Sequence, residues 1–221
     1  LNELKVVAEK DHKNSKTQTN YNQALGLYYR KTGDYKLALP YTLAAAKLAE
    51  ESGISKTHTA GQWLNAGNVY DELGDYNNSM ASNLKALRLF EEVGNDLGVS
   101  FCYNNMCAIY VNMKQYGKAL GYAQKSLAIK KKLGDKRGIC TALQSMGEVY
   151  TGLGNKSKAI SNYKLAIKIA EDQKMPPEQA ILYFNMGKIF AAENKDSIAI
   201  VYFKKSQAIA NKLDNKSLAA K

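Results

Sequence analysis

The residues of this sequence that could perform acid–base, nucleophilic or metal chemistry are few and scattered. Its three cysteines, Cys102, Cys107 and Cys140, form no CxxC pair, so their spacing predicts neither a zinc site nor a disulfide framework. The two histidines, His12 and His58, stand alone, and no HExxH motif, P-loop or nucleophile elbow accompanies them. We therefore expect no catalytic residue, no metal and no cofactor, and we expect this chain not to be an enzyme, although a parent protein could carry a kinase domain.

The composition describes an ordinary folded chain. Of its 221 residues, 45% are hydrophobic and 23% are charged, which is a globular balance. No apolar run reaches the roughly 18 residues that a membrane-spanning helix needs. With only three prolines and little alternation of period two, the long segments rich in Ala, Leu, Lys and Glu predict an all-α fold.

One phrase recurs along the chain at a nearly constant interval. It reads LGLYYRKTGDY at 25–35, AGNVYDELGDY at 66–76, MCAIYVNMKQY at 106–116, MGEVYTGLGNK at 146–156 and MGKIFAAENKD at 186–196. The anchor residues Gly26, Gly67, Cys107, Gly147 and Gly187 lie 41, 40, 40 and 40 residues apart. Such self-similarity is typical of repeat architectures.

Each repeat predicts two helices. In the fourth repeat, apolar residues at helical spacing predict helix A over 136–151, and a second stripe predicts helix B from Ser157. A glycine in the middle of helix A costs roughly 1 kcal/mol, so we expect helix B to approach it closely. Small residues recur at one position of helix B, namely Ala38, Ser79, Ala119, Ala159 and Ala199.

These residues resemble tandem tetratricopeptide repeats. The second repeat carries the pattern Trp63, Ala66, Gly67, Tyr70, Gly74, Asp75, Tyr76, Ser79, Asn83 and Ala86. The family's usual period is about 34 residues, and the longer period here resembles kinesin light-chain adaptors and the sensory regions of bacterial signalling proteins. Residues 127–163 resemble the bacterial group most, in which such arrays accompany a histidine kinase or a DNA-binding output domain.

The resemblance implies an α-solenoid, a right-handed superhelix of helix–turn–helix pairs. We expect one domain over 1–221, with about five full repeats at 14–54, 55–94, 95–134, 135–174 and 175–214. Residues 1–13 and 215–221 are expected to be partial repeats, so we expect the chain to be part of a longer array. The alternative is that either end is a solubilising cap, which such arrays require.

The resemblance also implies a concave groove lined by the A helices. Carrying the register over gives the candidate peptide-binding residues Arg30, Asn65, Asn68, Asp71, Asn104, Asn105, Gln144, Glu148, Asn185 and Lys188. The asparagines are the most informative, because Asn is a poor helix former and its amide can both donate to and accept from a peptide backbone. The alternative is that they hydrogen-bond neighbouring helices. The basic residues of a carboxylate clamp are missing, which argues against a receptor for chaperone tails.

The net charge of +11 permits an acidic partner. Lysines concentrate on the predicted B helices of the third and fourth repeats, where they form either a solvated surface or a functional basic patch. No nucleic-acid-binding motif accompanies them, so we expect no nucleic acid partner. Most of the 15 tyrosines fall at repeat positions, which predicts packing roles.

Together these observations predict a protein- or peptide-binding module. The first hypothesis is the sensory or regulatory input region of a larger bacterial signalling protein, which would meet a membrane only through its parent chain. The alternative is a freestanding scaffold that assembles protein partners. The residues fit a periplasmic sensor and a cytoplasmic scaffold equally, and they leave the oligomeric state open.

Overall fold

The described part of the chain is built from helices alone. In the computed structural model it comprises Asp11 and residues 14–219, with side chains to residue 213, so the partial repeat expected at 1–13 lies almost wholly outside it. The helices are α2 (Ser15–Thr32), α3 (Tyr35–Ser52), α4 (Lys56–Glu72), α5 (Tyr76–Glu92), α6 (Asp96–Asn112), α7 (Tyr116–Lys132), α8 (Lys136–Gly152), α9 (Lys156–Asp172), α10 (Pro176–Ala191) and α11 (Asp196–Ala219). The predicted all-α, solenoid-type fold is confirmed.

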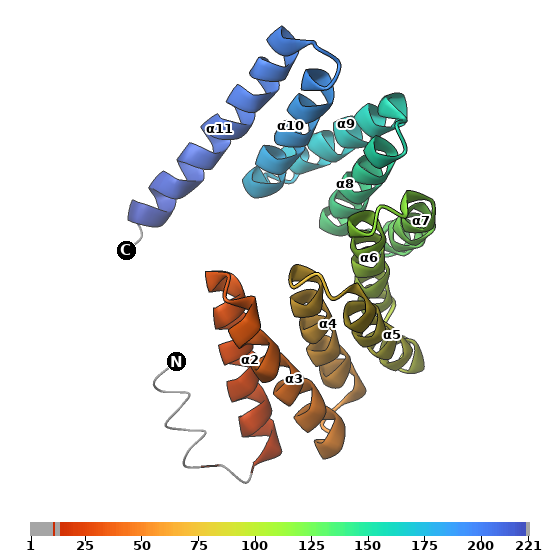
Figure 1. Cartoon of the computed structure of the whole chain (residues 1–221), viewed down its shortest axis with the longest axis vertical. Helices are drawn as coiled ribbons and strands as arrows, with labels where there is room; N and C mark the ends of the chain where they lie inside the picture. Colours follow the sequence, from red (N-terminus) through yellow and green to blue (C-terminus); the bar gives the residue numbers. More distant parts are fainter. Residues whose placement is uncertain (1–10, 12–13, 220–221) are drawn as a thin grey trace. The chain divides into compact units, whose positions relative to one another are not determined.

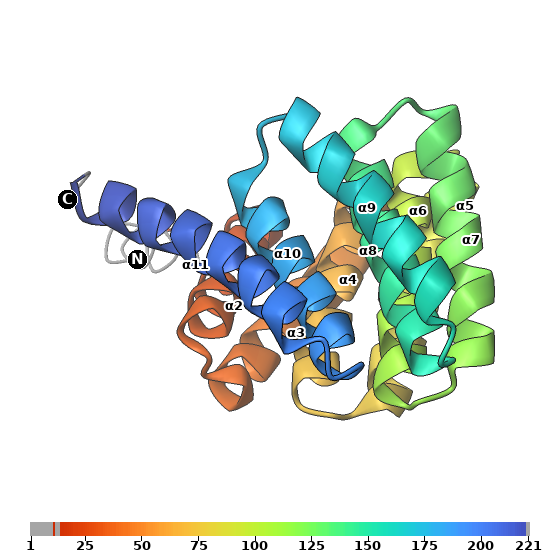
Figure 2. The same ribbon diagram turned by 90° about the horizontal axis from the view of Figure 1, so that it is seen from above.

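The contacts divide the chain into two compact units. The first unit comprises Leu1–Ile109 and the second comprises Tyr110–Lys221, so the boundary falls within α6. In each unit, successive helices pack as antiparallel pairs, as α2 with α3 and α10 with α11 show in Figure 1. Figure 2 shows the second unit's helices α7, α8 and α9 following one another side by side.

A left-handed residue ends each helix from α2 to α10. Six of these nine turn residues are glycines, and the others are Lys114, Lys174 and Asn194 with φ of 57°, 51° and 56°. In several turns the next residue caps the following helix, as Asp135 does by accepting a hydrogen bond from the Gly138 N–H at 2.9 Å. The pair Gly–Asp or Gly–Asn therefore both stops one helix and starts the next.

Helix α11 extends past residue 215, where the sequence predicted the start of a partial repeat. Helix α11 continues to Ala219 without a turn. At Asp214, 40 residues after Lys174, the backbone is helical and not in the left-handed conformation that ends the earlier helices.

Helix B does approach the anchor glycines, as predicted. A Cβ placed on Gly147 would lie 2.5 Å from the ring of Tyr163, and one on Gly187 would lie 2.6 Å from Phe203. The predicted small residues of helix B, among them Ala159, are all buried. The side chain that covers each glycine is a different one and lies four residues further along helix B.

The core of the second unit gathers buried residues from α7 to α10. It includes Leu127, Cys140, Tyr163, Leu182 and Met186. Because the apolar faces of these helices pack into this core, polar side chains of α8 and α10 remain at the surface, where they can make other contacts.

Candidate functional site

The first unit contains an open groove of about 590 Å³, which we call the first-unit groove. Helices α2, α4 and α6 supply most of its wall, as the predicted role of the A helices requires. The groove is lined by Gln23, Thr57, His58, Gly61, Gln62, Leu64, Asn65, Asn68, Phe90, Phe101 and Asn105. This wall contains no carboxylate and no lysine or arginine, so its polar chemistry comes from side-chain amides, a threonine hydroxyl and one imidazole.

Amide hydrogen bonds join neighbouring A helices along this groove. Gln62 Nε2 donates to Gln23 Oε1 at 2.8 Å, which links α4 to α2. Asn105 Nδ2 donates to Asn68 Oδ1 at 2.8 Å, which links α6 to α4. The structural alternative for the asparagines therefore holds for Asn68 and Asn105, although each amide retains further donor or acceptor capacity.

Asn65 differs from its neighbours on α4. Its amide lines the groove and makes no hydrogen bond with the part of the chain that the structure describes. An asparagine in a helix interior is a poor helix former, and this one gains no side-chain hydrogen bond within the described chain to offset that cost. Asn65 is therefore the groove residue best placed to bond a ligand.

Gln62 carries an unsatisfied atom at the same groove. Its side chain is 2% exposed. Its Nε2 bonds Gln23 and lies 3.3 Å from His58 Nε2, while its Oε1 is buried without a partner. A buried acceptor without a donor costs about 1–3 kcal/mol unless a water supplies the hydrogen bond.

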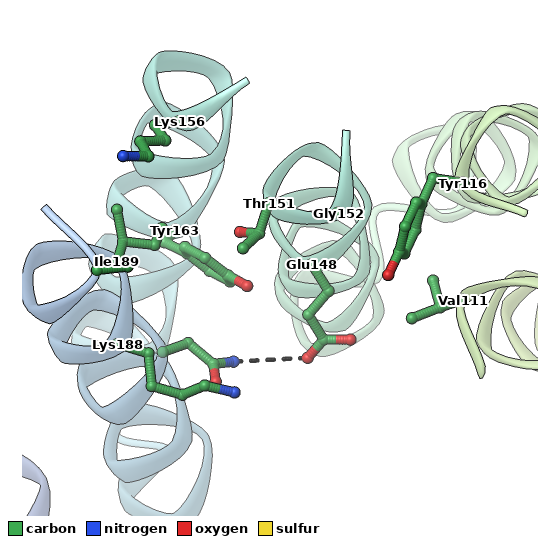
Figure 3. A pocket seen from close by; sticks show the side chains of 11 residues that line it. Val111, Tyr116, Glu148, Thr151, Gly152, Lys156, Tyr163, Lys188 and Ile189 are labelled. Atoms are coloured by element: carbon green, nitrogen blue, oxygen red, sulfur yellow. Dashed lines mark hydrogen bonds between the residues drawn. The ribbon is translucent and has the colours of Figure 1, made fainter. Parts of the chain in front are cut away.

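The second unit contains a cavity of about 520 Å³, which we call the second-unit cavity. Figure 3 shows Glu148 of α8 and Lys188 of α10 facing it, with Tyr116 and Tyr163 on its walls. The full lining is Val111, Tyr116, Glu148, Thr151, Gly152, Lys156, Tyr163, Asn185, Lys188, Ile189 and Ala192. Five of these residues are aromatic or aliphatic and five are polar or charged, so the cavity combines apolar walls with several polar groups, as ligand pockets do.

Glu148 is the one carboxylate among the residues that line the second-unit cavity. Its Oε1 accepts from Gln144 Nε2 at 3.1 Å and from Asn185 Nδ2 at 3.5 Å (Figure 3). Of the two lysines, Lys156 is paired with Glu193 at 3.6 Å. Burial is the main cause that raises the pKa of the Tyr163 phenol well above its usual range. The phenol on this wall of the cavity therefore stays uncharged.

The structure brings together six of the ten candidate residues, in two groups. Asn65, Asn68 and Asn105 line the first-unit groove, and Glu148, Asn185 and Lys188 line the second-unit cavity. Gln144 reaches the second group only through Glu148, and Arg30, Asp71 and Asn104 line neither site.

Sequence reasoning missed the aromatic walls. Phe101 lies four residues before Asn105 on α6, so helical spacing could have found it. Tyr116 and Tyr163 come from the start of α7 and from α9, where packing roles were expected, and no spacing rule could have predicted their place at the cavity. A Cβ on Gly152 would lie 2.2 Å from the Tyr116 ring, so the absence of that atom is what admits the ring.

No catalytic or metal-binding cluster emerges elsewhere in the described residues. Among them, no three His, Cys, Asp or Glu side chains lie close enough to hold a metal ion. The three thiols are buried, and burial raises the pKa of Cys102 to about 12 and that of Cys140 to about 11. None of the described helices combines the length and hydrophobicity that crossing a bilayer requires.

Several solved structures share this fold. BtubC from P. vanneervenii is 18% identical with a TM-score of 0.74, and the match covers 96% of this chain and 87% of that one. Aspartyl phosphate phosphatase F from Bacillus subtilis is 18% identical with a TM-score of 0.80, covering 94% and 55%. The Rap conjugation gene regulator of plasmid pLS20, solved with the Phr* peptide, is 16% identical with a TM-score of 0.80, covering 90% and 55%. This chain thus spans about half the length of the latter two.

Such low identities demonstrate a shared fold and nothing more. No curated protein sequence matches this chain. The sequence does match the tetratricopeptide repeat family over residues 59–132 and 99–172, which together make up more than half of the chain. The match, the recurring helix pairs and the close contacts at the anchor glycines agree, and the chain belongs to the tetratricopeptide repeat family.

Proposed function

We propose that this chain is a protein-interaction module that binds an extended peptide segment in the first-unit groove. The observation that carries the proposal is the Asn65 amide, which lines the groove without an intramolecular hydrogen bond in the described chain. An amide can accept a backbone N–H and donate to a backbone carbonyl of the same peptide. Because the groove wall has no carboxylate, lysine or arginine, we expect recognition to depend on the peptide backbone and to tolerate many uncharged sequences.

Apolar surface beside the amides supports the same proposal. Phe101, 44% exposed, and Leu64 lie in the groove wall next to Asn65 and Asn105. They offer side-chain contacts while the amides hold the backbone. The structural similarity to the Rap regulator, which was solved with a peptide, is a further point in favour at the level of the fold.

The experiment measures binding to an array of random seven-residue peptides by the full chain. Asn65→Ala removes up to two hydrogen bonds worth about 0.5–1.5 kcal/mol each, so we expect affinities for selected peptides to fall roughly tenfold. Asn77→Ala, an exposed asparagine on α5, is the matched control and should bind as the wild type does. Equal binding by both variants, or no peptide binding by the wild type, would refute the proposal.

Asn65→Ala alone is a sharper test than replacing several asparagines together. Asn105 is bonded to Asn68, and Asn185 is bonded to Glu148. Replacing either would break a bond between helices and so change stability together with any effect on binding. Asn65 has no such bond, so circular dichroism should be unchanged and the melting temperature should stay the same or rise slightly, because alanine is the better helix former.

We further propose that this module is the sensory or regulatory input region of a larger bacterial signalling protein, such as a histidine kinase or a transcriptional regulator. Support comes from the resemblance of residues 127–163 to repeats of that group. The alternative is a freestanding scaffold. An antibody against this chain, applied to fractionated source cells, distinguishes the two. A band far above 24.4 kDa supports the input region, and a band close to that mass supports the scaffold.

A further inference from the structure

A small hollow of about 260 Å³ lies on α7. It shares no lining residue with the second-unit cavity. We call it the α7 hollow. It is lined by Tyr110, Lys118, Gly121, Tyr122 and Lys125. Lys118, Gly121, Tyr122 and Lys125 follow one another at helical spacing on one face of α7.

The two tyrosines and two lysines of the hollow form an ordered group. The Tyr110 and Tyr122 rings stack with centroids 5.6 Å apart and an interplanar angle of 14°. Lys118 Nζ lies 5.4 Å from the Tyr110 centroid, and Lys125 Nζ lies 5.5 Å from that of Tyr122. Cation–π contacts of this kind hold both ammonium groups beside the hollow, which lowers the entropy lost when they bind an anion.

The first repeat shows which of these residues the fold needs. There Tyr29 and Tyr41 stack with the same separation, 5.6 Å, and the same angle, 14°. The positions of Lys118, Gly121 and Lys125, however, hold Leu37, Pro40 and Ala44. The stacked pair is therefore a packing feature of the repeat, whereas the two lysines and the glycine are not required for it.

The local charge is strongly positive. Residues 97–134 contain six lysines and no aspartate or glutamate. Lys118 is exposed and has no ion pair in the described chain. Gly121 leaves open space, because a Cβ there would meet no atom within 4 Å. The hollow thus combines two cations, an uncovered stretch of helix and no competing carboxylate in its own helix.

We propose that the α7 hollow binds an anionic side chain, a carboxylate or a phosphate, of an acidic protein segment. Ammonium groups bind such groups as point charges, and the hollow has the size of a side-chain group rather than of a large ligand. A single-stranded nucleic acid fits less well, because it needs free aromatic faces for base stacking. Here the rings stack on each other and are flanked by the lysines. This site is independent of the first-unit groove.

The experiment uses the full chain and a capped, dye-labelled peptide of eight alternating Glu and Gly residues, with Gln in place of Glu in the control peptide. Fluorescence anisotropy at low salt should detect the Glu peptide and not the Gln peptide. We expect Lys118→Ala with Lys125→Ala to weaken binding about tenfold. The matched control, Lys164→Ala with Lys168→Ala on α9, removes the same charge from exposed lysines and should weaken it less than threefold.

Gly121→Leu provides a second variant that leaves all charges in place. It should fill the hollow and weaken binding about tenfold without lowering the melting temperature, since Gly121 faces open space. If the two double lysine variants lost equal affinity for the Glu peptide, the effect would be one of overall charge and the proposal would be overturned. So would undiminished binding by Gly121→Leu, no binding by the wild type, or tighter binding of an oligo(dT) strand that depends on the same lysines.

Discussion

Replacing Gly147 with alanine tests the closest contact between helices α8 and α9. A Cβ at this position would lie 2.5 Å from Tyr163 Cε1 and 2.7 Å from its Cδ1 and Cζ atoms. Carbon atoms in ordinary contact lie about 3.5–4.0 Å apart, so the ring would have to move by about 1 Å. Tyr163 is only 2% exposed, and it packs in the core of the second unit, so it has little room to do so.

The expected magnitude is the difference between two effects. Overpacking a well-packed core costs about 1–3 kcal/mol, whereas Gly to Ala inside a helix gains about 0.5–1 kcal/mol. We therefore expect Gly147→Ala to lower the free energy of unfolding by about 1–2 kcal/mol. Gly121→Ala is the matched control, because its new Cβ meets nothing within 4 Å. It should show only the helical gain.

The assay is thermal unfolding of both variants followed by circular dichroism and by calorimetry. For a chain of this size, 1 kcal/mol shifts the melting temperature by roughly 2–4 °C. Both glycines lie in the second unit, so both variants report on the same part of the chain. Gly147→Ala should melt a few degrees below the wild type, and Gly121→Ala should melt slightly above it.

Two results would refute the reasoning. If Gly147→Ala melted at or above the wild-type temperature, the glycine would not be needed for close approach of the two helices. If Gly121→Ala lost as much stability as Gly147→Ala, the loss would reflect glycine replacement in general and not the Tyr163 contact.

Three further predictions follow from backbone geometry, burial and charge. Lys114→Gly should raise the urea midpoint by the equivalent of about 1 kcal/mol, because Lys114 has a φ of 57°, and a lowered midpoint would contradict this. Cys102 and Cys140 should react slowly with Ellman's reagent in the folded protein at pH 8 and fast in urea, since burial raises their pKa values; equal rates would disprove it. Burial is the main cause, and a hydrogen bond to Glu171 the second, that raise the pKa of Tyr183 from the usual value of 10 to about 12. The stability that the protonated Tyr183 phenol contributes should be complete below pH 10 and should be lost as the pH rises through 12. The melting temperature should therefore fall less between pH 9 and pH 11.5 in Tyr183→Phe than in the wild type.

The turns and helix pairs could be predicted because their signals are local. Gly154 and Asn155, for example, stop α8 and start α9 through their own backbone preference and side-chain capping. Pro176 likewise begins α10, as expected of proline in a first helical turn. At Asp214 the backbone stays helical and α11 continues past the predicted start of a partial repeat.

The partners of the candidate site could not be predicted, because they depend on contacts between helices. Asn65 and Asn68 are the same residue type one turn apart on α4, yet Asn68 is bonded to Asn105 and Asn65 to no described residue. Which of them is left to bind a ligand depends on where α6 places Asn105. The sequence contains both residues and no signal that separates them.

By itself, then, the sequence determined the repeat, the end of α8 and the start of α9 to within one residue, and the close approach of the helices in each pair. Glycine, proline and capping residues act over a few positions, so their effects can be derived from the sequence alone. Only the tertiary structure decided that Thr42, Asn83, Tyr163 and Phe203 cover the anchor glycines, and that Tyr116 reaches the second-unit cavity. These contacts join residues of different helices, and their geometry follows from how whole helices pack against each other.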